Sequence, residues 1–382
     1  MKIISLRLKN NFLGWDFDEV DFSSNLTLLV GVSGAGKTQI LRAILDLKSI
    51  VNGKAINGLE WKINFYTVNN TEFIWEGSFE TIETDESTFY EGENEDIFYE
   101  DEDDYPSLLY EKLTSQNDVI IERSPEKIKF KNIEMPKLSS YQSIIYTLRE
   151  ESMIKEAYDA LNKIEYRDQT RNGLNVYRIS DKPLHFLTSK YKTLESIINS
   201  DENIHAKLYF VHENKLNIFN KIKSKFIEIF QQVEDIKIKL LHTHHTSNGR
   251  LFIPFIFIKE NCVPQWIRDD KMSSGMLRTL IHISEIYLST PGTVILIDEF
   301  ENSLGINCID ILTDDLIHEN KNLQFIATSH HPYIINNIPY EYWKIVTRKG
   351  GHINIRNASD YHLGKSKQEA FLQLTKILEK QL

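Results

Sequence analysis

An eight-residue glycine-rich loop between a predicted strand and a predicted helix constrains this chain more than any other feature. Residues 31–38 read Gly-Val-Ser-Gly-Ala-Gly-Lys-Thr, which satisfies the pattern G-x-x-x-x-G-K-[ST]. Residues 25–31 form a short apolar run of strand type, and residues 38–51 have helical periodicity. The order strand, loop, helix makes the pattern specific, so the alternative, a glycine-rich turn that holds no ligand, is disfavoured.

The residue types of this loop suit phosphate groups. Glycines let the backbone wrap closely, so that its N–H groups face a β-phosphate, and the start of the following helix adds roughly half a positive charge. Lys37 supplies a mobile charge to the β- and γ-phosphates, and the Thr38 hydroxyl can ligate Mg²⁺. We therefore expect the loop to bind ATP and magnesium. The expected nucleotide-binding residues are Gly31, Ser33, Gly34, Ala35, Gly36, Lys37 and Thr38.

A second run of strand type, near the other end of the chain, ends in acids. Asp298 follows the apolar residues 294–297 at the carboxyl end of this run, where open α/β sheets place their ligands. We expect Asp298 to hold Mg²⁺, directly or through water, and Glu299 to orient and polarise the attacking water. The alternative is a solvated strand end. Because residues 323–331 form a third such run, both ends of the chain are expected to share one parallel sheet.

Residues 271–288 begin with small hydroxyl residues and a glycine and continue as an amphipathic helix. Taken alone, Ser273 or Ser274 would simply cap this helix. However, Ser-Ser-Gly-Met stands about one helix before the acidic strand, and a Ser-His segment follows that strand. This motif order resembles that of the SMC, Rad50, RecF and OLD-type branch of the ABC-type ATPases. The resemblance implies an α/β fold, an ABC-type P-loop ATPase head with a mixed β-sheet, flanking helices and an inserted, mainly helical subdomain.

The resemblance also implies a homodimer in which two heads face each other across ATP. Ser274 and Gly275 of one head would then contact the γ-phosphate bound by the other. The switch histidine of the family falls on His330, with His331 as its neighbour. A buried structural histidine is the alternative for this position.

Further positions follow from the same resemblance. Lys37, Glu299 and His330 would be the catalytic residues. Gln142 would contact the nucleotide and Mg²⁺, although a lone glutamine before a helix is common. Residues 302–304 occupy the D-loop position and depart from its commoner small-acidic pattern.

The resemblance covers the two ends of the chain, whereas the middle has a different character. We expect the head to comprise residues 1–68 and 236–382, and the insertion to comprise residues 69–235. Within the insertion, the acidic segment 83–104 is expected to be mobile, because blocks of like charge are most often solvated. An amphipathic helical pattern with lysines on one side follows at residues 214–236. Strand patterns then return at residues 236–241 and 251–260.

Charge and composition limit the partners and the compartment. The formal net charge of −11 argues against indiscriminate coating of nucleic acid, while a local basic surface could still bind it. The 2 cysteines are far apart and indicate neither a disulfide framework nor a zinc module, which favours reducing cytoplasm. No apolar run approaches the roughly 20 residues of a membrane helix, so no membrane partner is expected. His242, His244 and His245 alternate like metal ligands, but no nearby carboxylate or cysteine completes a set.

The ATPase hypothesis leaves open what the ATP cycle controls. The short insertion and residues 298–305 and 328–339 resemble those of Septu, PARIS and retron-associated ATPases, which hold and release a separate toxic nuclease. We therefore expect a regulatory ATPase of an anti-phage defence complex with a separate effector. A RecF- or SMC-like DNA-repair or DNA-clamp ATPase is the alternative, and a transporter subunit is disfavoured. A nuclease domain of its own is not expected, because only residues 354–382 follow the last motif strand.

Overall fold

The computed structural model describes residues 1–83, 105–167, 184–200, 202–242, 252–301 and 322–361, together with residue 373. The chain divides into two compact units. Unit 1 comprises Met1–Arg167, Pro291–Glu299 and Lys321–Leu382, and unit 2 comprises Asp168–Thr290 and Phe300–Asn320. This division differs from the boundaries expected at residues 68 and 236. The strands that follow residue 69 continue the sheet of unit 1 and do not begin a separate helical subdomain.

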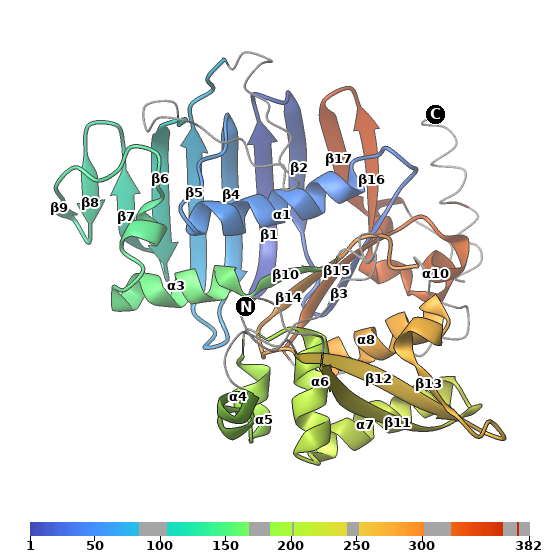
Figure 1. Cartoon of the computed structure of the whole chain (residues 1–382). Helices are drawn as coiled ribbons and strands as arrows, with labels where there is room; N and C mark the ends of the chain where they lie inside the picture. Colours follow the sequence, from blue (N-terminus) through green and yellow to red (C-terminus); the bar gives the residue numbers. More distant parts are fainter. Residues whose placement is uncertain are drawn as a thin grey trace. The chain divides into compact units, whose positions relative to one another are not determined.

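Within the described residues, unit 1 is built on a mixed sheet of 14 strands, in the order β10-β14-β15-β3-β16-β17-β2-β1-β4-β5-β6-β7-β8-β9 (Figure 1). The strands are β1 (Lys2–Asn10), β2 (Trp15–Asp21), β3 (Leu26–Val30), β4 (Leu59–Tyr66), β5 (Glu72–Phe79), β6 (Leu108–Ser115), β7 (Asp118–Arg123), β8 (Ile128–Phe130), β9 (Ile133–Glu134), β10 (Ile164–Arg167), β14 (Val294–Ile297), β15 (Gln324–Ser329), β16 (Trp343–Lys349) and β17 (His352–Asn357). Its helices are α1 (Lys37–Val51), α2 (Ile144–Thr147), α3 (Ser152–Asn162) and α10 (Pro332–Asn337), with short 3-10 turns η4 (Tyr340–Tyr342) and η5 (Ala358–Tyr361). This architecture confirms the expected α/β class.

One half of the sheet is parallel and contains the motif strands. β10, β14, β15, β3 and β16 pair in parallel, each with its neighbour in this order. Every residue of β3, β14 and β15 is buried. Continuous burial of this kind requires cover on both faces, which is why these strands are mainly apolar and show no alternation between buried and exposed residues.

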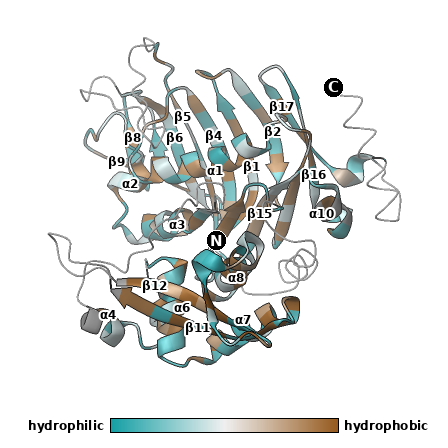
Figure 2. Ribbon diagram, turned by 45° about the vertical axis from the view of Figure 1, so that its right-hand side comes forward, coloured by the Kyte–Doolittle hydropathy of each residue, from teal (hydrophilic) through white to brown (hydrophobic). Residues whose placement is uncertain are grey.

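The other half is antiparallel and alternates. β1 pairs with β2 and β4, and β4 to β9 follow as a meander of antiparallel neighbours. In β5 burial changes with each residue, as expected for a sheet with one face on the core and one face toward solvent. Figure 2 shows hydrophilic and hydrophobic residues interspersed along these strands.

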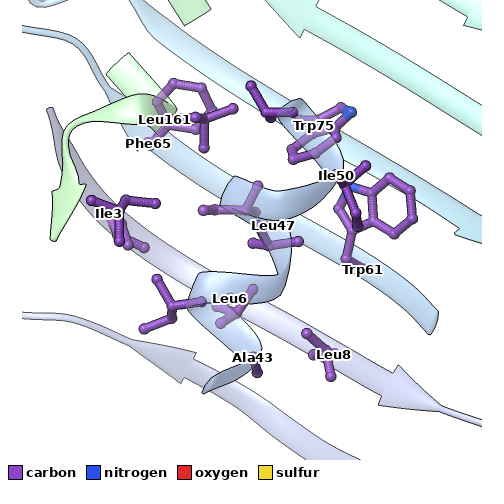
Figure 3. Close-up of a cluster of buried hydrophobic side chains, with 14 of the residues drawn as sticks. Ile3, Leu6, Leu8, Ala43, Leu47, Ile50, Trp61, Phe65, Trp75 and Leu161 are labelled. Atoms are coloured by element: carbon purple, nitrogen blue, oxygen red, sulfur yellow. The ribbon is translucent and has the colours of Figure 1, made fainter. Parts of the chain in front are cut away.

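Helix α1 anchors the core of unit 1. Its buried residues Ile40, Ile44, Leu47 and Val51 recur at helical spacing. They belong to one hydrophobic cluster with residues of β1 and β4, and Figure 3 shows Leu47 and Ile50 among Leu6, Leu8, Trp61, Phe65 and Trp75. Full burial of each such side chain contributes about 1.5–3 kcal/mol to the free energy of folding. The core therefore fixes α1, and with it the loop at its amino end, against the sheet.

A buried polar cluster lies at the far part of the same sheet. The Glu111 carboxylate is fully buried and accepts hydrogen bonds from Trp75 Nε1 at 3.0 Å, from the Ser143 hydroxyl and from the Ile144 N–H at 2.7 Å. Burial raises the pKa of Glu111, against the opposing effect of these hydrogen bonds and of Arg123. The guanidinium of Arg123 donates to the carbonyls of residues 139, 140 and 142. The pair thus fixes the loop that precedes α2.

Unit 2 combines a small sheet with helices. Its strands β11 (Val233–His242), β12 (Phe252–Glu260) and β13 (Trp266–Arg268) are antiparallel neighbours in that order. Its helices are α4 (Leu184–Lys190), α5 (Leu194–Ile198), α6 (Ile204–Glu213), α7 (Asn217–Ile229) and α8 (Ser274–Leu288), with the 3-10 turn η3 (Asp269–Lys271) before α8. The helical pattern at residues 214–236 ends earlier than expected, since β11 begins at Val233. No helix in the described ranges is long and apolar enough to cross a membrane.

Among the described histidines of unit 2, His205 has the largest shift in pKa. It lies on α6, which packs against α8, and only 3% of it is exposed. Burial lowers the pKa of His205 from 6.5 to about 4, although the nearby Glu285 of α8 acts in the opposite direction. The folded protein therefore keeps this imidazole neutral at a pH where the unfolded chain protonates it.

The lowered pKa of His205 predicts that the folded protein loses stability in acid. Below pH 6.5 the unfolded state takes up a proton that the folded state refuses until about pH 4, so the free energy of unfolding falls as the pH falls through this window. From pH 7 to pH 5 the contribution of His205 amounts to about 2 kcal/mol. Urea denaturation of the parent and of His205→Leu at both pH values measures it. An equal pH dependence in the two proteins would contradict the assignment.

Candidate nucleotide-binding site

The register of three parallel strands brings the sequence motifs to one edge of the sheet in unit 1. Val30 at the end of β3 pairs with Ser329 of β15, and Ala327 of β15 pairs with Ile297 of β14. The residues that follow each strand therefore emerge side by side. They are the glycine-rich loop after β3, Asp298 and Glu299 after β14, and His330 after β15.

The loop between β3 and α1 has a backbone that requires glycine. Gly34 and Gly36 have φ angles of 81° and 101°, in the left-handed region. A Cβ on Gly36 would also stand 2.8 Å from Cδ1 of Ile353, and one on Gly31 would collide with the carbonyl oxygen of Val346. Ser33 and Gly34 are exposed, whereas Ala35, Gly36 and Lys37 are buried. The loop is therefore tightly packed against the protein on its carboxyl side and solvent-exposed at Ser33 and Gly34.

Lys37 lies folded over this loop. Its ammonium group donates to the carbonyl oxygens of Gly31 at 2.7 Å and Val32 at 2.9 Å, and the residue is 9% exposed. A buried ammonium group at the amino end of a helix suits an anion with several oxygens. The geometry therefore fits the phosphate role expected for Lys37.

Thr38 and Asp298 meet although 260 positions separate them in the chain. The Thr38 hydroxyl donates to Oδ2 of Asp298 at 2.9 Å and lies 3.2 Å from Oδ1. A hydroxyl and a carboxylate next to a phosphate loop are the hard oxygen donors that Mg²⁺ prefers. The donor set therefore fits the magnesium site expected from the sequence.

Two residues that the motifs do not include complete the group around Asp298. The buried Thr328 of β15 donates its hydroxyl to Oδ1 of Asp298 at 2.5 Å and accepts the N–H of Glu299 at 2.8 Å. Glu299 needs such support, since its φ of 47° lies in the left-handed region that non-glycine residues rarely adopt. Tyr166 at the end of β10 places its hydroxyl 3.5 Å from Oδ2 of Asp298. In the sequence, the position of Thr328 close before His330 was the one sign that it could belong to the site.

The structure does not bring Gln142 to this site, which corrects the expectation that it contacts nucleotide and Mg²⁺. Gln142 precedes α2, and Tyr146 of α2 packs against Gly53, just beyond the carboxyl end of α1. The phosphate loop stands at the opposite end of α1, about 22 Å away for a helix of this length. Glu111 and Arg123 hold the Gln142 segment there. On the side of β14 away from β15, the neighbouring strand is β10, and it contributes Tyr166 instead.

The remaining expected residues fall into three groups. In unit 2, Ser273 caps α8 by accepting the N–H of Met276 at 3.2 Å, and Ser274 is exposed with Gly275 half-buried. In unit 1, His330 and His331 are both exposed, so neither is the buried structural histidine that was the alternative. Outside the described residues lie residues 84–104 and 302–304, His244 and His245, and for His242 the side chain is not described.

The sequence matches one family over most of its length. The model of the family "AAA domain, putative AbiEii toxin, Type IV TA system" matches residues 26–336. The chain belongs to this AAA family. No curated protein matches it.

Solved structures similar to this AAA-family chain include three SMC heads. An SmcHead bound to the C-winged helix domain of ScpA shares 15% identity, with 93% of this chain and 97% of that chain covered and a TM-score of 0.45. The SMC head domain from Thermotoga maritima shares 12%, with 94% and 99% covered and a TM-score of 0.43. A Smc head domain with an extended coiled coil, bound to the C-terminal domain of ScpA derived from Pyrococcus furiosus, shares 14%, with 98% and 99% covered and a TM-score of 0.44.

The loop backbone of this AAA-family chain predicts a selective effect of one methyl group. Gly36→Ala places a side chain at a left-handed φ and against Ile353, so the loop must shift, and we expect nucleotide affinity to fall at least about tenfold. Gly14→Ala is the matched control, because Gly14 also has a left-handed φ, of 67°, but has open space around its Cβ. Titration with a fluorescent ATP analogue measures both. Equal affinity in the two variants would contradict the prediction.

Proposed function

We propose that this chain is a cytoplasmic, magnesium-dependent ATPase that regulates a separate effector protein in a defence complex. The contact between Thr38 and Asp298 carries the proposal, because it joins the phosphate loop to the acidic strand end at hydrogen-bond distance. Lys37 lies in the same loop with its ammonium buried. These three side chains are the minimum set for holding a magnesium nucleotide.

The roles of the side chains follow from their placement. The loop N–H groups and Lys37 would hold the β- and γ-phosphates, and Thr38 and Asp298 would hold Mg²⁺, which neutralises charge on the phosphate oxygens. The exposed Glu299 would orient a water molecule for attack on the γ-phosphate and accept its proton. His330, at the end of the strand between β14 and β3, would contact the γ-phosphate side of the site.

A dimer supplies the missing half of the site in this proposal. Ser274 and Gly275 begin helix α8, whose first turn is capped by Ser273 and leaves Ser274 exposed. The N–H groups in the first turn of an exposed helix suit the phosphate of a nucleotide held by a second chain. ATP between two copies would then hold the dimer closed, and hydrolysis would release it.

Two observations support a role in defence. The description of the family names a toxin and a type IV TA system, and the sequence resembles defence-associated ATPases in its insertion and in the segments after β14 and β15. The family description connects such AAA domains with toxin systems, and the resemblance to defence-associated ATPases connects this chain with a toxic partner. We infer that the effector, for which a nuclease is the leading candidate, is a separate polypeptide controlled by the ATP-bound dimer.

Substitution of Thr328 tests whether its support of Asp298 and Glu299 matters for hydrolysis. Thr328→Val keeps the shape of the side chain but removes the hydroxyl that supports Asp298 and the Glu299 backbone. Losing hydrogen bonds to a charged group costs about 1.5–3 kcal/mol, so we expect kcat for ATP to fall about 10- to 100-fold. The Kd for ATP should change little, because the loop contacts are intact. Thr328→Ser keeps the hydroxyl and should retain most of the turnover; a loss equal to that in Thr328→Val would contradict the role.

Lys37 and Glu299 separate binding from hydrolysis. Lys37→Ala removes the charge that meets the phosphates and should abolish measurable ATP binding. Glu299→Gln keeps the phosphate contacts and removes only the proton acceptor, so it should bind ATP, turn over at least about 100-fold more slowly and accumulate as a closed dimer. Phosphate release and light scattering in the presence of ATP and Mg²⁺ measure these effects. Parental turnover in Glu299→Gln would refute the assignment of the water-orienting residue.

The partner is tested by capture with the slow variant. Tagged Glu299→Gln is purified from its native cells with ATP present, and Lys37→Ala is purified in parallel as the control that cannot close on ATP. A stoichiometric nuclease or other toxic effector retained only by Glu299→Gln supports the regulatory role. Recovery of DNA-repair factors without such an effector would replace it with the RecF-like alternative.

A further inference from the structure

The small sheet of unit 2 has two chemically different faces. One face packs against α6 and α7, and its residues Ile236, Ile238, Ile256 and Ile258 are buried. The opposite face carries mainly cations and aromatic rings, with one carboxylate, Asp235, at its edge opposite Lys259, and none of its members is fully buried. We call it the aromatic-basic face; its cations and rings are Lys237 and Lys239 of β11, Phe255, Phe257 and Lys259 of β12, and Trp266 and Arg268 of β13.

The pairing register interleaves the two kinds of side chain. Lys237 stands opposite Phe257, which in turn stands opposite Arg268. The neighbouring rungs pair Lys239 with Phe255, and Lys259 with Trp266. Residues directly opposite each other on one face lie within contact distance, so each ring has a cation beside it.

The cations lie over the rings. Lys237 Nζ is 3.3 Å from the ring centroid of Trp266 and 5.8 Å from that of Phe257, and the guanidinium carbon of Arg268 is 5.0 Å from that of Phe255. The rings are half-buried, which leaves part of each one at the surface. Cation–π contacts at such exposed positions are worth about 0.5–1 kcal/mol, so a ligand can exchange them at low cost.

Part of the positive charge on this face is left without a counter-charge. Arg268 pairs with Asp270, and Asp235 pairs with Lys223 of α7. Among the described residues, neither Lys237 nor Lys239 forms an ion pair. Partial desolvation and the neighbouring Lys239 and Lys259 lower the pKa of Lys237, against the opposing effect of Asp235. An anion on the face would relieve this repulsion.

Exposed rings interleaved with cations suit one class of ligand. The flat faces of unpaired nucleobases stack on aromatic side chains, and the backbone phosphates between them meet lysine and arginine. A duplex offers phosphates but keeps its base faces stacked inside, and an acidic peptide offers carboxylates but few flat faces. We propose that the aromatic-basic face binds single-stranded nucleic acid. Bases stack on Trp266, Phe257 and Phe255, while Lys237 turns from the ring to a phosphate.

This site is independent of the proposed ATPase activity, so it is tested without nucleotide. The probes are fluorescein-labelled 15-nucleotide oligo(dT) and oligo(U), and the readout is fluorescence anisotropy of the full chain. Trp266→Ala removes one stacking ring and should weaken binding about tenfold. Trp266→Phe retains a ring and should recover most of the affinity, which separates stacking from a folding defect.

The lysines are tested by the salt dependence. A plot of the logarithm of the binding constant against the logarithm of the salt concentration has a slope that reflects the number of phosphate contacts. In Lys237→Ala, and likewise in Lys239→Ala, the magnitude of this slope should fall by about 0.7, the value for one phosphate contact with a single strand. Lys221→Ala is the matched control, because Lys221 is an exposed lysine on α7 of the same unit. It should leave the affinity within about twofold and the slope unchanged. The two oligonucleotides distinguish DNA from RNA as the natural strand.

Three results would overturn the proposal. The first is absence of binding at micromolar protein, and the second is equal affinity in the parent, Trp266→Ala and the Lys237→Ala, Lys239→Ala double variant. The third is displacement of the oligonucleotide by poly-glutamate or duplex DNA as readily as by unlabelled oligo(dT), because this would show recognition of charge alone. ATP turnover assays decide the proposed function separately.

Discussion

Parallel pairing of β3, β15 and β14 is the constraint on which the rest of unit 1 depends. It aligns segments that stand hundreds of residues apart in the chain, and its register sends the residues after each strand to the same edge. The Thr38–Asp298 hydrogen bond is a consequence of that register. The complete burial of the three strands is the other consequence, because a parallel sheet covered on both faces has no solvent side. The same interaction therefore determines both the core and the site.

The parts of the site that the sequence could predict are those with a local signature. Lys37, Thr38 and Asp298 belong to short patterns next to a recognisable strand end, and the structure brings these three together. Gln142 had no such context, and the buried Glu111–Arg123 pair holds its segment at the far end of α1. Long-range polar contacts of this kind leave no periodic trace in the sequence.

The fold shows the same contrast. The strands at both ends of the chain and the helices at residues 38–51 and 271–288 were predicted, because apolar runs and helical periodicity are local properties. The antiparallel extension from β5 to β9 was missed. The acidic character of the middle of the chain suggested a separate insertion from residue 69, although the burial of β5 alternates as in any half-covered strand. The acidic composition of this region thus drew attention away from the strand-type alternation of β5, which the sequence does contain.

Thr328 has a further consequence for how the carboxyl ends of β15 and β14 are coupled. Its single hydroxyl joins Asp298 and the Glu299 backbone, and His330 stands two residues further along the same extended segment. Any movement of this end of β15 would therefore displace the Asp298 carboxylate and the Glu299 backbone together. One hydroxyl thus couples the positions of these two neighbouring residues.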